Sequence, residues 1–169
     1  MRRLFIALEI PEDKKDLLYE VSKALSKSVS GNFVDRDKMH VTIRFLGDPN
    51  IPDDRITGAV KEINGGFRRE IDVRGVDSFY HGDTPSVMFF NVSTDLSDIN
   101  SKLSALLGIE EDKRFYPHIT ICRLKGRDGV EDARRKYKDF SLSFLSNGLT
   151  LFDSDFKSYR RITGPSAGS

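Results

Sequence analysis

The stretch His40-Val41-Thr42-Ile43 returns in the second half of the chain as His118-Ile119-Thr120-Ile121. In an extended strand, residues i and i+2 point to the same face. Each copy therefore places an imidazole and a hydroxyl side by side, with aliphatic side chains on the opposite face. The two copies use two of the three histidines in the chain. Two such strands facing each other would surround one cavity with two imidazoles and two hydroxyls.

This set of groups suits the hydrolysis of a phosphodiester without metal. An imidazole titrates near neutrality, so a pair can supply a general base and a general acid. In-line displacement at phosphorus needs these two groups on opposite sides of the atom, which a pseudo-twofold pair provides. The hydroxyls can donate hydrogen bonds to an anion between them. The symmetry leaves open which histidine is the acid.

Composition bounds the fold and the partners. A chain of 169 residues fits one domain, or two small lobes that share a core. We expect a single bilobed domain over residues 1–163, and a small polar tail at 164–169 that frays. Lys and Arg number 27 against 26 Asp and Glu, so bulk charge carries no nucleic-acid signature. Basic clusters nevertheless occur in both halves, for example Arg68-Arg69 and Arg134-Arg135-Lys136.

Several classes of site and location are disfavoured. The single cysteine, Cys122, excludes an intrachain disulfide and a Cys-rich metal site. No apolar run approaches the ~18 residues of a membrane span, and the apolar run that starts the chain is too short for a signal peptide. We therefore expect a cytoplasmic protein, without membrane contact and monomeric.

The order of elements predicts an α+β fold in which both halves read strand, helix, H-x-T strand, helix. The apolar spacing predicts strands at 4–8, 40–46, 87–92, 118–124 and 140–144, a strand from 71 that breaks at Gly75, and a closing hairpin of 149–151 with 156–162. It predicts helices at 11–28, 52–63, 95–107 and 130–137, the first with an apolar stripe of Leu17, Leu18, Val21, Ala24 and Leu25. Residues 78–86, with His81, are predicted to be a surface loop.

Five stretches resemble the 2H phosphoesterase superfamily, and within it the RNA 2′,3′-cyclic phosphodiesterases once called 2′-5′ RNA ligases. They are RRLFIALEIP (2–11), HVTIRFLGD (40–48), PSVMFFNVS (85–93), FYPHITICRLKG (115–126) and FDSDFKSYRRI (152–162). The chain departs from the family pattern in the short region 78–86 and in having Phe89-Phe90 where the family has Trp. These departures concern contacts to the substrate base rather than the chemistry.

The resemblance implies a two-lobed pseudo-twofold fold, with mostly antiparallel sheets around a central cleft and helices outside. It implies metal-independent hydrolysis of an RNA 2′,3′-cyclic phosphate end to a 2′-phosphomonoester, with reverse 2′-5′ ligation as a further activity. By matching position, His40 would be the proton donor to the leaving 3′-oxygen and His118 the proton acceptor from the attacking water. Thr42 and Thr120 would hold the non-bridging oxygens. No cofactor is implied.

Four further residues are candidates for substrate contact. Arg44 lies four residues after His40, which places it on the face of that histidine. Arg123 lies five residues after His118, nominally on the opposite face unless a bulge intervenes. Tyr116 could stack on a base, and Phe5 could line the cleft.

Other function classes are weaker or stay open. A zinc site needs three or four ligands, and the chain has no H-x-H, H-x-x-x-H or Cys pair. It also lacks a Gly-rich phosphate loop with Lys, as an ATP-dependent ligase would need. Two alternatives remain: a non-catalytic module that binds RNA ends or phosphorylated ligands, and a phosphodiesterase for a small cyclic nucleotide. Turnover in EDTA separates catalysis from binding.

Overall fold

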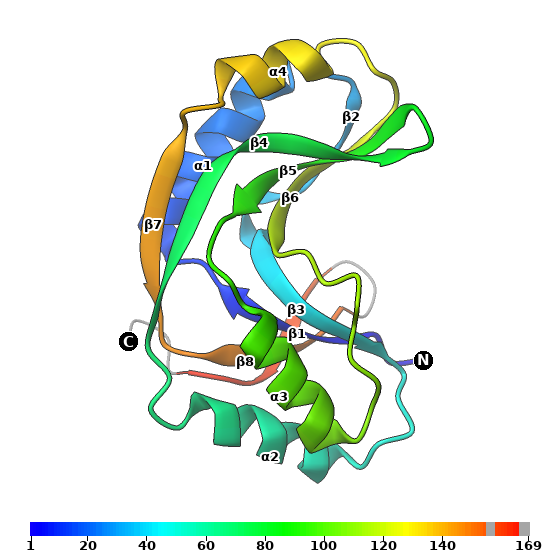
Figure 1. Ribbon diagram of the computed structural model, residues 1–169, viewed down its shortest axis with the longest axis vertical. Helices are drawn as coiled ribbons and strands as arrows, with labels where there is room; N and C mark the ends of the chain where they lie inside the picture. Colours follow the sequence, from blue (N-terminus) through cyan, green and yellow to red (C-terminus); the bar gives the residue numbers. More distant parts are fainter. Residues whose placement is uncertain (155–157, 166–169) are drawn as a thin grey trace.

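The computed structural model describes residues 1–154 and 158–165 and has an α+β architecture with two antiparallel sheets (Figure 1). The first sheet has the order β3-β1-β8-β9, with β3 at His40–Gly47, β1 at Leu4–Glu9, β8 at Leu149–Asp153 and β9 at Arg160–Thr163. The second, strongly curved sheet has the order β2-β6-β5-β4-β7, with β2 at Gly31–Phe33, β6 at His118–Leu124, β5 at Thr84–Val92, β4 at Arg69–His81 and β7 at Ser141–Ser146. Each sheet thus contributes one H-x-T strand.

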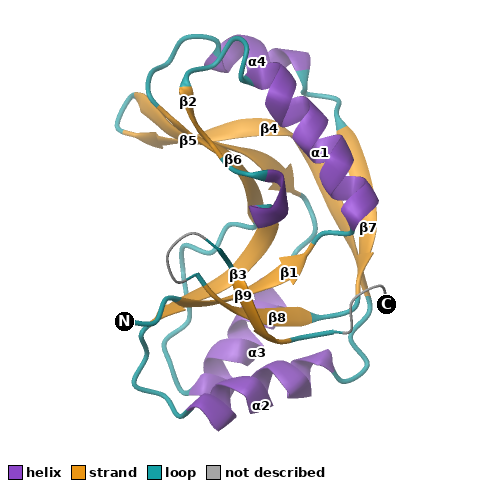
Figure 2. Cartoon of the chain, turned by 180° about the vertical axis from the view of Figure 1, so that it is seen from behind, coloured by secondary structure: helices purple, strands orange, loops and turns teal. Residues whose placement is uncertain are grey.

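Each of the two sheets is covered by a pair of helices that come from different halves of the chain. They are α1 (Glu12–Leu25), α2 (Asp53–Asn64), α3 (Ser97–Leu107) and α4 (Val130–Lys136), with a short 3₁₀ helix η1 at Arg36–Lys38. α2 contacts α3 and β8, and α3 contacts β3, so this pair covers the first sheet. α1 and α4 lie side by side on the second sheet in both views (Figures 1 and 2). Each sheet is therefore covered by one helix from each half of the chain.

Helix and strand patterns explain the burial. Ile56, Ala59, Val60 and Ile63 form the buried face of α2, as their spacing predicts. One hydrophobic cluster joins the two sheets and includes Ile43 of β3 with Ile119 and Ile121 of β6. A smaller cluster of Phe5, Ala7 and Phe152 lies on the other face of the first sheet. No helix among the described residues is long and apolar enough to cross a bilayer.

Both H-x-T strands carry an irregularity three residues after the histidine. On β3, Thr42 pairs with Ala7 and Arg44 with the adjacent Ile6, so Ile43 is an extra residue. On β6, Thr120 and Cys122 pair with the adjacent residues Phe89 and Met88, so Ile121 is extra. An extra residue shifts the alternation of side chains by one position. The residue that shares the histidine's face beyond the bulge is therefore the fifth after it, rather than the fourth.

The structure corrects the predictions for three segments of the chain. α1 ends at Leu25 rather than 28, and Leu17 is 52% exposed, so the apolar stripe of this helix is narrower than predicted. Gly75 does not end a strand: it adopts φ +72° within a register irregularity, and β4 continues to His81. The predicted loop 78–86 is therefore the end of β4, a turn at Gly82-Asp83 and the start of β5.

The C-terminal predictions are met in part. β8 and β9 form the predicted closing hairpin. Residues 156 and 157 of the predicted last strand, and residues 166–169 of the predicted tail, lie outside the described residues.

Two glycines offer a test of how α4 is fixed against the end of α1. Gly129, at φ +82°, would place a Cβ 2.3 Å from the Ser28 carbonyl oxygen, whereas Gly82, at φ +63°, has open space. Gly82→Ala should lower the unfolding free energy by about 1–2 kcal/mol, the cost of the left-handed conformation. Gly129→Ala should add the roughly 1–3 kcal/mol of overpacking. Urea unfolding measures both, and equal losses would contradict the clash.

Candidate active site

A cleft of about 330 Å³ lies between the two H-x-T strands. It is lined by His40, Thr42, His118 and Thr120 together with Val34, Lys38, Phe45, Phe79, Val87, Arg123 and Tyr159. Apart from the histidines, the titratable side chains in this lining are Lys38, Arg123 and Tyr159, and none is a carboxylate. The described lining thus suits an anion.

Each histidine is held by the carbonyl oxygen two residues before it. His40 Nδ1 lies 2.6 Å from the Lys38 oxygen, and His118 Nδ1 lies 2.6 Å from the Tyr116 oxygen. A carbonyl oxygen only accepts, so each Nδ1 carries the hydrogen and donates it. This leaves Nε2 of each neutral ring as a proton acceptor for the cleft.

The two threonines differ in the free protein. Thr42 Oγ1 lies 2.7 Å from His40 Nε2, and since this Nε2 lacks a hydrogen, the hydroxyl donates to it. Among the described residues, no such bond joins Thr120 to His118. The Thr120 hydroxyl can therefore turn to a ligand without breaking a bond to its histidine.

Aromatic rings surround both histidines. The His40 ring centroid lies 4.9 Å from that of Phe5 and 5.5 Å from that of Tyr159. The pKa of His40 is lowered to about 4, chiefly by burial and to a smaller extent by the nearby His118 and Lys15, while the hydrogen bond to the Lys38 carbonyl opposes the shift. Burial also lowers the pKa of His118, opposed by the hydrogen bond to the Tyr116 carbonyl. Both imidazoles are therefore largely neutral at pH 7 in the free protein.

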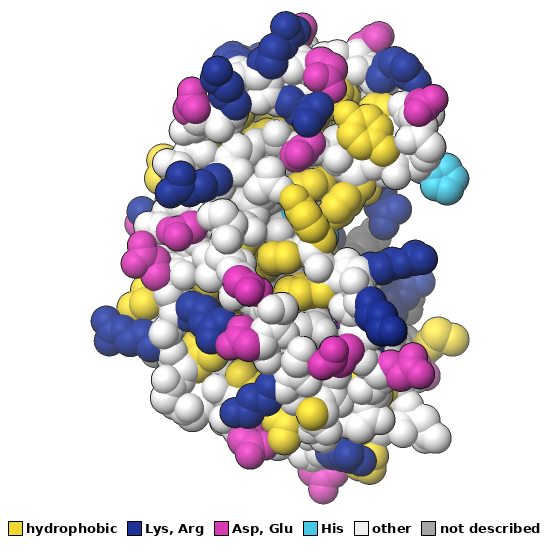
Figure 3. All heavy atoms as spheres, viewed as in Figure 1, with side chains coloured by type: hydrophobic (Ala, Val, Ile, Leu, Met, Phe, Trp, Pro, Cys, Tyr) yellow, Lys and Arg dark blue, Asp and Glu magenta, His cyan; other side chains and the backbone are white. Residues whose placement is uncertain are grey.

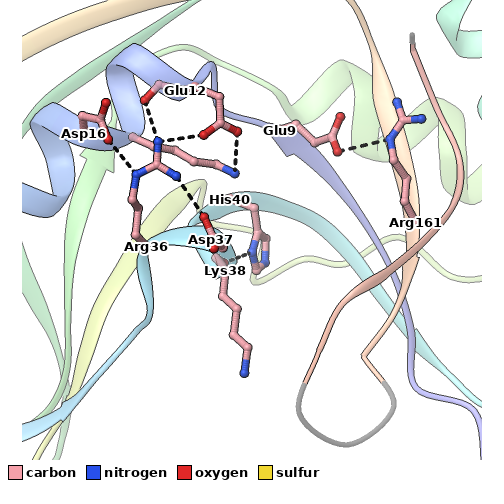
Figure 4. A network of polar contacts seen from close by, with 9 residues as sticks. Glu9, Glu12, Asp16, Arg36, Asp37, Lys38, His40 and Arg161 are labelled. Atoms are coloured by element: carbon pink, nitrogen blue, oxygen red, sulfur yellow. Dashed lines mark hydrogen bonds and ion pairs between the residues drawn. The ribbon is translucent and has the colours of Figure 1, made fainter. Parts of the chain in front are cut away.

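A polar network positions the carbonyl that orients His40 (Figure 4). Arg36 donates from Nε to Asp16 (2.6 Å) and from Nη2 to the Glu12 carboxylate (2.7 Å), both on α1. It also donates to Asp37 beside it (2.9 Å). These bonds tie η1 to α1, and η1 ends at Lys38, whose carbonyl accepts from His40.

The predicted substrate-contact residues lie in different places. Arg123 lines the cleft, because the bulge at Ile121 brings it to the face of His118. Phe5 is almost fully buried and packs against the His40 ring rather than lining the cleft. Tyr116 lies beside the cleft, 49% exposed, and its hydroxyl donates to Asn91 Oδ1 at 2.9 Å.

The prediction that Arg44 shares the face of His40 is wrong. The bulge at Ile43 turns Arg44 toward the core side of the first sheet. There it donates to Ser104 Oγ at 3.2 Å and to the Glu110 carbonyl at 2.7 Å. Phe45 takes the place on the cleft face that the simple alternation gives to Arg44.

Sequence reasoning missed several lining residues. Lys38 and Phe45 stand two before and five after His40, so the repeat itself could have pointed to them. Phe79, Val87 and Tyr159 carry no such signal, because they reach the cleft from other strands and a loop. Cys122 faces the core, and burial raises the pKa of its thiol to about 11.

The described residues contain no group of three or more His, Cys, Asp or Glu side chains placed to hold a metal ion. The predicted metal independence is a statement about activity, and it remains a prediction.

Comparison with known proteins gives a consistent match. The model of the 2′-5′ RNA ligase superfamily matches residues 15–156. The RNA 2′,3′-cyclic phosphodiesterase of Aquifex aeolicus (strain VF5) is 27% identical over 150 residues, covering 80% of this chain and 79% of that protein. The enzyme of the same name from Methanocaldococcus jannaschii is 26% identical over 161 residues, covering 90% and 91%.

The fold matches solved structures over nearly their whole length. The crystal structure of TT0787 of Thermus thermophilus has a TM-score of 0.71 at 23% identity, with 95% of each chain covered. That of E. coli LigT complexed with NADP+ has a TM-score of 0.68 at 18% identity, covering 96% of this chain and 95% of that one. The family model spans most of the chain, and the two sheets match the fold of these structures. The chain therefore belongs to the 2′-5′ RNA ligase superfamily, a family of 2H phosphoesterases.

Proposed function

We propose that the protein hydrolyses RNA 2′,3′-cyclic phosphate ends to 2′-phosphomonoesters, without metal, by acid/base catalysis from its two cleft histidines. One observation carries this proposal. Two imidazoles, each held at Nδ1 by a carbonyl, and two hydroxyls line a single cleft from opposite sheets. The names of the relatives in Aquifex and Methanocaldococcus support the same substrate.

The proposed step transfers two protons. Nε2 of His118 takes a proton from a water molecule, whose oxygen forms a bond to phosphorus. The bond from phosphorus to the 3′-oxygen breaks, and Nε2 of protonated His40 gives its proton to that oxygen. The hydroxyls of Thr42 and Thr120 donate to the non-bridging oxygens, where charge develops. Arg123, which lines the cleft beyond Thr120, adds positive charge on the same side.

The electrostatics of His40 link substrate binding to proton uptake. As a donor it must be protonated, yet burial lowers its pKa to about 4. A cyclic phosphate is an anion, and an opposite charge close by favours the charged form of an imidazole. The substrate therefore raises the pKa of His40 as it binds and brings a proton into the cleft with it.

The neutral histidines favour catalysis over a binding module. A site that only binds a phosphate is better served by Arg or Lys, because neutral imidazoles add no charge. A phosphodiesterase for a small cyclic nucleotide would use the same four groups, so the identity of the substrate needs its own experiment. Reverse 2′-5′ ligation would follow from the same proton transfers run backwards.

Incubation of an oligonucleotide bearing a 2′,3′-cyclic phosphate with the protein in EDTA should yield only the 2′-phosphate. The reason is that protonation of the 3′-oxygen leaves the phosphate on the 2′-oxygen. Chromatography against both isomers measures the outcome. A 3′-phosphate product would overturn the donor role of His40, and activity restored only by added metal would overturn the metal-free mechanism. Binding without hydrolysis would instead support the binding module.

A further inference from the structure

At two positions of the H-x-T repeat, one copy has a cationic residue where the other copy has an aromatic residue. Because both strands bulge three residues after the histidine, the positions two before and five after it correspond. The first copy has Lys38 and Phe45 at these positions, and the second has Tyr116 and Arg123. Each half thus gives one cation and one aromatic residue, in swapped order. The two cations in the cleft lining therefore stand at positions that the pseudo-twofold symmetry does not relate.

The ammonium group of Lys38 lines the cleft at a place apart from the His40 imidazole. The carbonyl oxygen of Lys38 accepts from His40, while in Figure 4 the side chain runs on past the imidazole and its ammonium ends apart from the ring. The Nζ atom lies 5.6 Å from the centroid of the Tyr159 ring, on the wall of the cleft. Within residues 1–154 and 158–165, no carboxylate lies within ion-pair distance of Lys38. The Lys38 ammonium therefore faces the cleft and forms no ion pair with a carboxylate of the described residues. The space-filling view shows several Lys and Arg side chains gathered beside the hollowed flank of the molecule (Figure 3).

The cleft therefore offers more positive charge than a cyclic phosphate requires. A cyclic phosphodiester carries one negative charge. In the proposed step, Thr42, Thr120 and Arg123 already interact with the phosphate oxygens that carry this charge. A lysine is a compact point charge that binds phosphate well. Because it ends apart from the His40 imidazole in the same cleft, the Lys38 ammonium suits an anion that is next to the reacting phosphate but distinct from it.

We propose that Lys38 binds the internucleotide phosphate on the 5′ side of the terminal nucleotide. It thereby makes the protein select chains of two or more nucleotides over a cyclic mononucleotide. This inference rests on the proposed function, and it adds a residue that determines specificity without taking part in the proton transfers. Lys38 acts on the binding of the second nucleotide, so its effect belongs in KM.

The test compares two substrates, adenosine 2′,3′-cyclic phosphate and the dinucleotide ApA ending in a 2′,3′-cyclic phosphate. Lys38→Met should lower kcat/KM for the dinucleotide about tenfold, through KM, the usual worth of one charged hydrogen bond. It should leave the mononucleotide within about twofold. Lys38→Arg should retain the preference for the dinucleotide. Lys102→Met, at a lysine of α3 outside the cleft lining, is the matched control and should change neither.

Salt gives an independent readout. The logarithm of kcat/KM should fall with the logarithm of salt concentration more steeply for the dinucleotide, and Lys38→Met should reduce that slope by about 1. Equal losses on both substrates would place Lys38 on the reacting phosphate and overturn the inference, as would no loss on either. If the unmodified protein turned over neither substrate, the proposed function itself would fail, which is a different result.

Discussion

Replacing either cleft histidine by alanine should lower kcat for a 2′,3′-cyclic phosphate by about 10²–10⁴, the usual contribution of one positioned acid or base. The double variant should lose less than the product of the two single losses, because the residues act as a unit. Steady-state kinetics on all three variants measures the effect. His81→Ala is the matched control, since His81 is exposed at the end of β4 and outside the cleft lining.

The pKa values of the two histidines predict how the rate depends on pH. Burial holds the pKa values of both histidines below 6.5 in the free protein, with that of His40 at about 4. The kcat/KM profile, which reports the free enzyme, should therefore be a bell with its maximum below pH 6.5. The kcat profile reports the complex, where the bound anion raises both values, so its maximum should lie at higher pH. Full activity in either single variant would contradict the paired mechanism, and identical maxima would contradict the rise of the histidine pKa values on substrate binding.

Thr120→Val should lower kcat by about 10², near the lower end of the loss seen when one donor to a developing charge is removed. Valine keeps the branched shape that a strand favours, so β6 should be unaffected. Thr42→Val should cause a loss of similar size. It should also raise the pKa of His40, because the Thr42 hydroxyl donates to the neutral form of that imidazole. Only the Thr42 variant should therefore shift the pH profile.

Thr84→Val, at an exposed threonine at the start of β5, is the control for both threonines. If kcat stayed unchanged in Thr120→Val, the hydroxyl would have no part in stabilising charge at phosphorus. If the pH profile moved equally in both variants, the difference between the two threonines in the free protein would be irrelevant to catalysis.

The sequence predicted the four central groups of the site because they lie within three residues of each other on a strand. His40 and Thr42, and His118 and Thr120, stand before the bulges, where simple alternation holds. Beyond the bulges, simple alternation no longer predicts which face a side chain occupies. The extra residues, Ile43 and Ile121, are ordinary strand formers, and only pairing with β1 and β5 makes them extra. For this reason Arg44 was misplaced and the face of Arg123 could not be decided.

Tertiary context also decided features that local pattern could not. The apolar spacing of α2 and α3 correctly predicts their buried faces, but the spacing in α1 does not show that Leu17 is exposed. Gly75 carries the ordinary signal of a strand break, yet its positive φ is absorbed within β4. Which sheet each helix would cover was not encoded in any single segment, since α1 and α3 both cross to the sheet of the other half.

The exchange of helices has a mechanical consequence. To widen the cleft, the sheets would have to separate, and this would stretch the connections that cross between them, from β1 to α1 and from β5 through α3 to β6 (Figures 1 and 2). Such a movement would expose part of the cluster that joins both sheets, and burial of apolar surface opposes it. Widening the cleft between His40 and His118 therefore costs free energy. For the proposed function, this favours a substrate whose reacting phosphate lies at the free end of a chain, because such an end can enter without separation of the sheets.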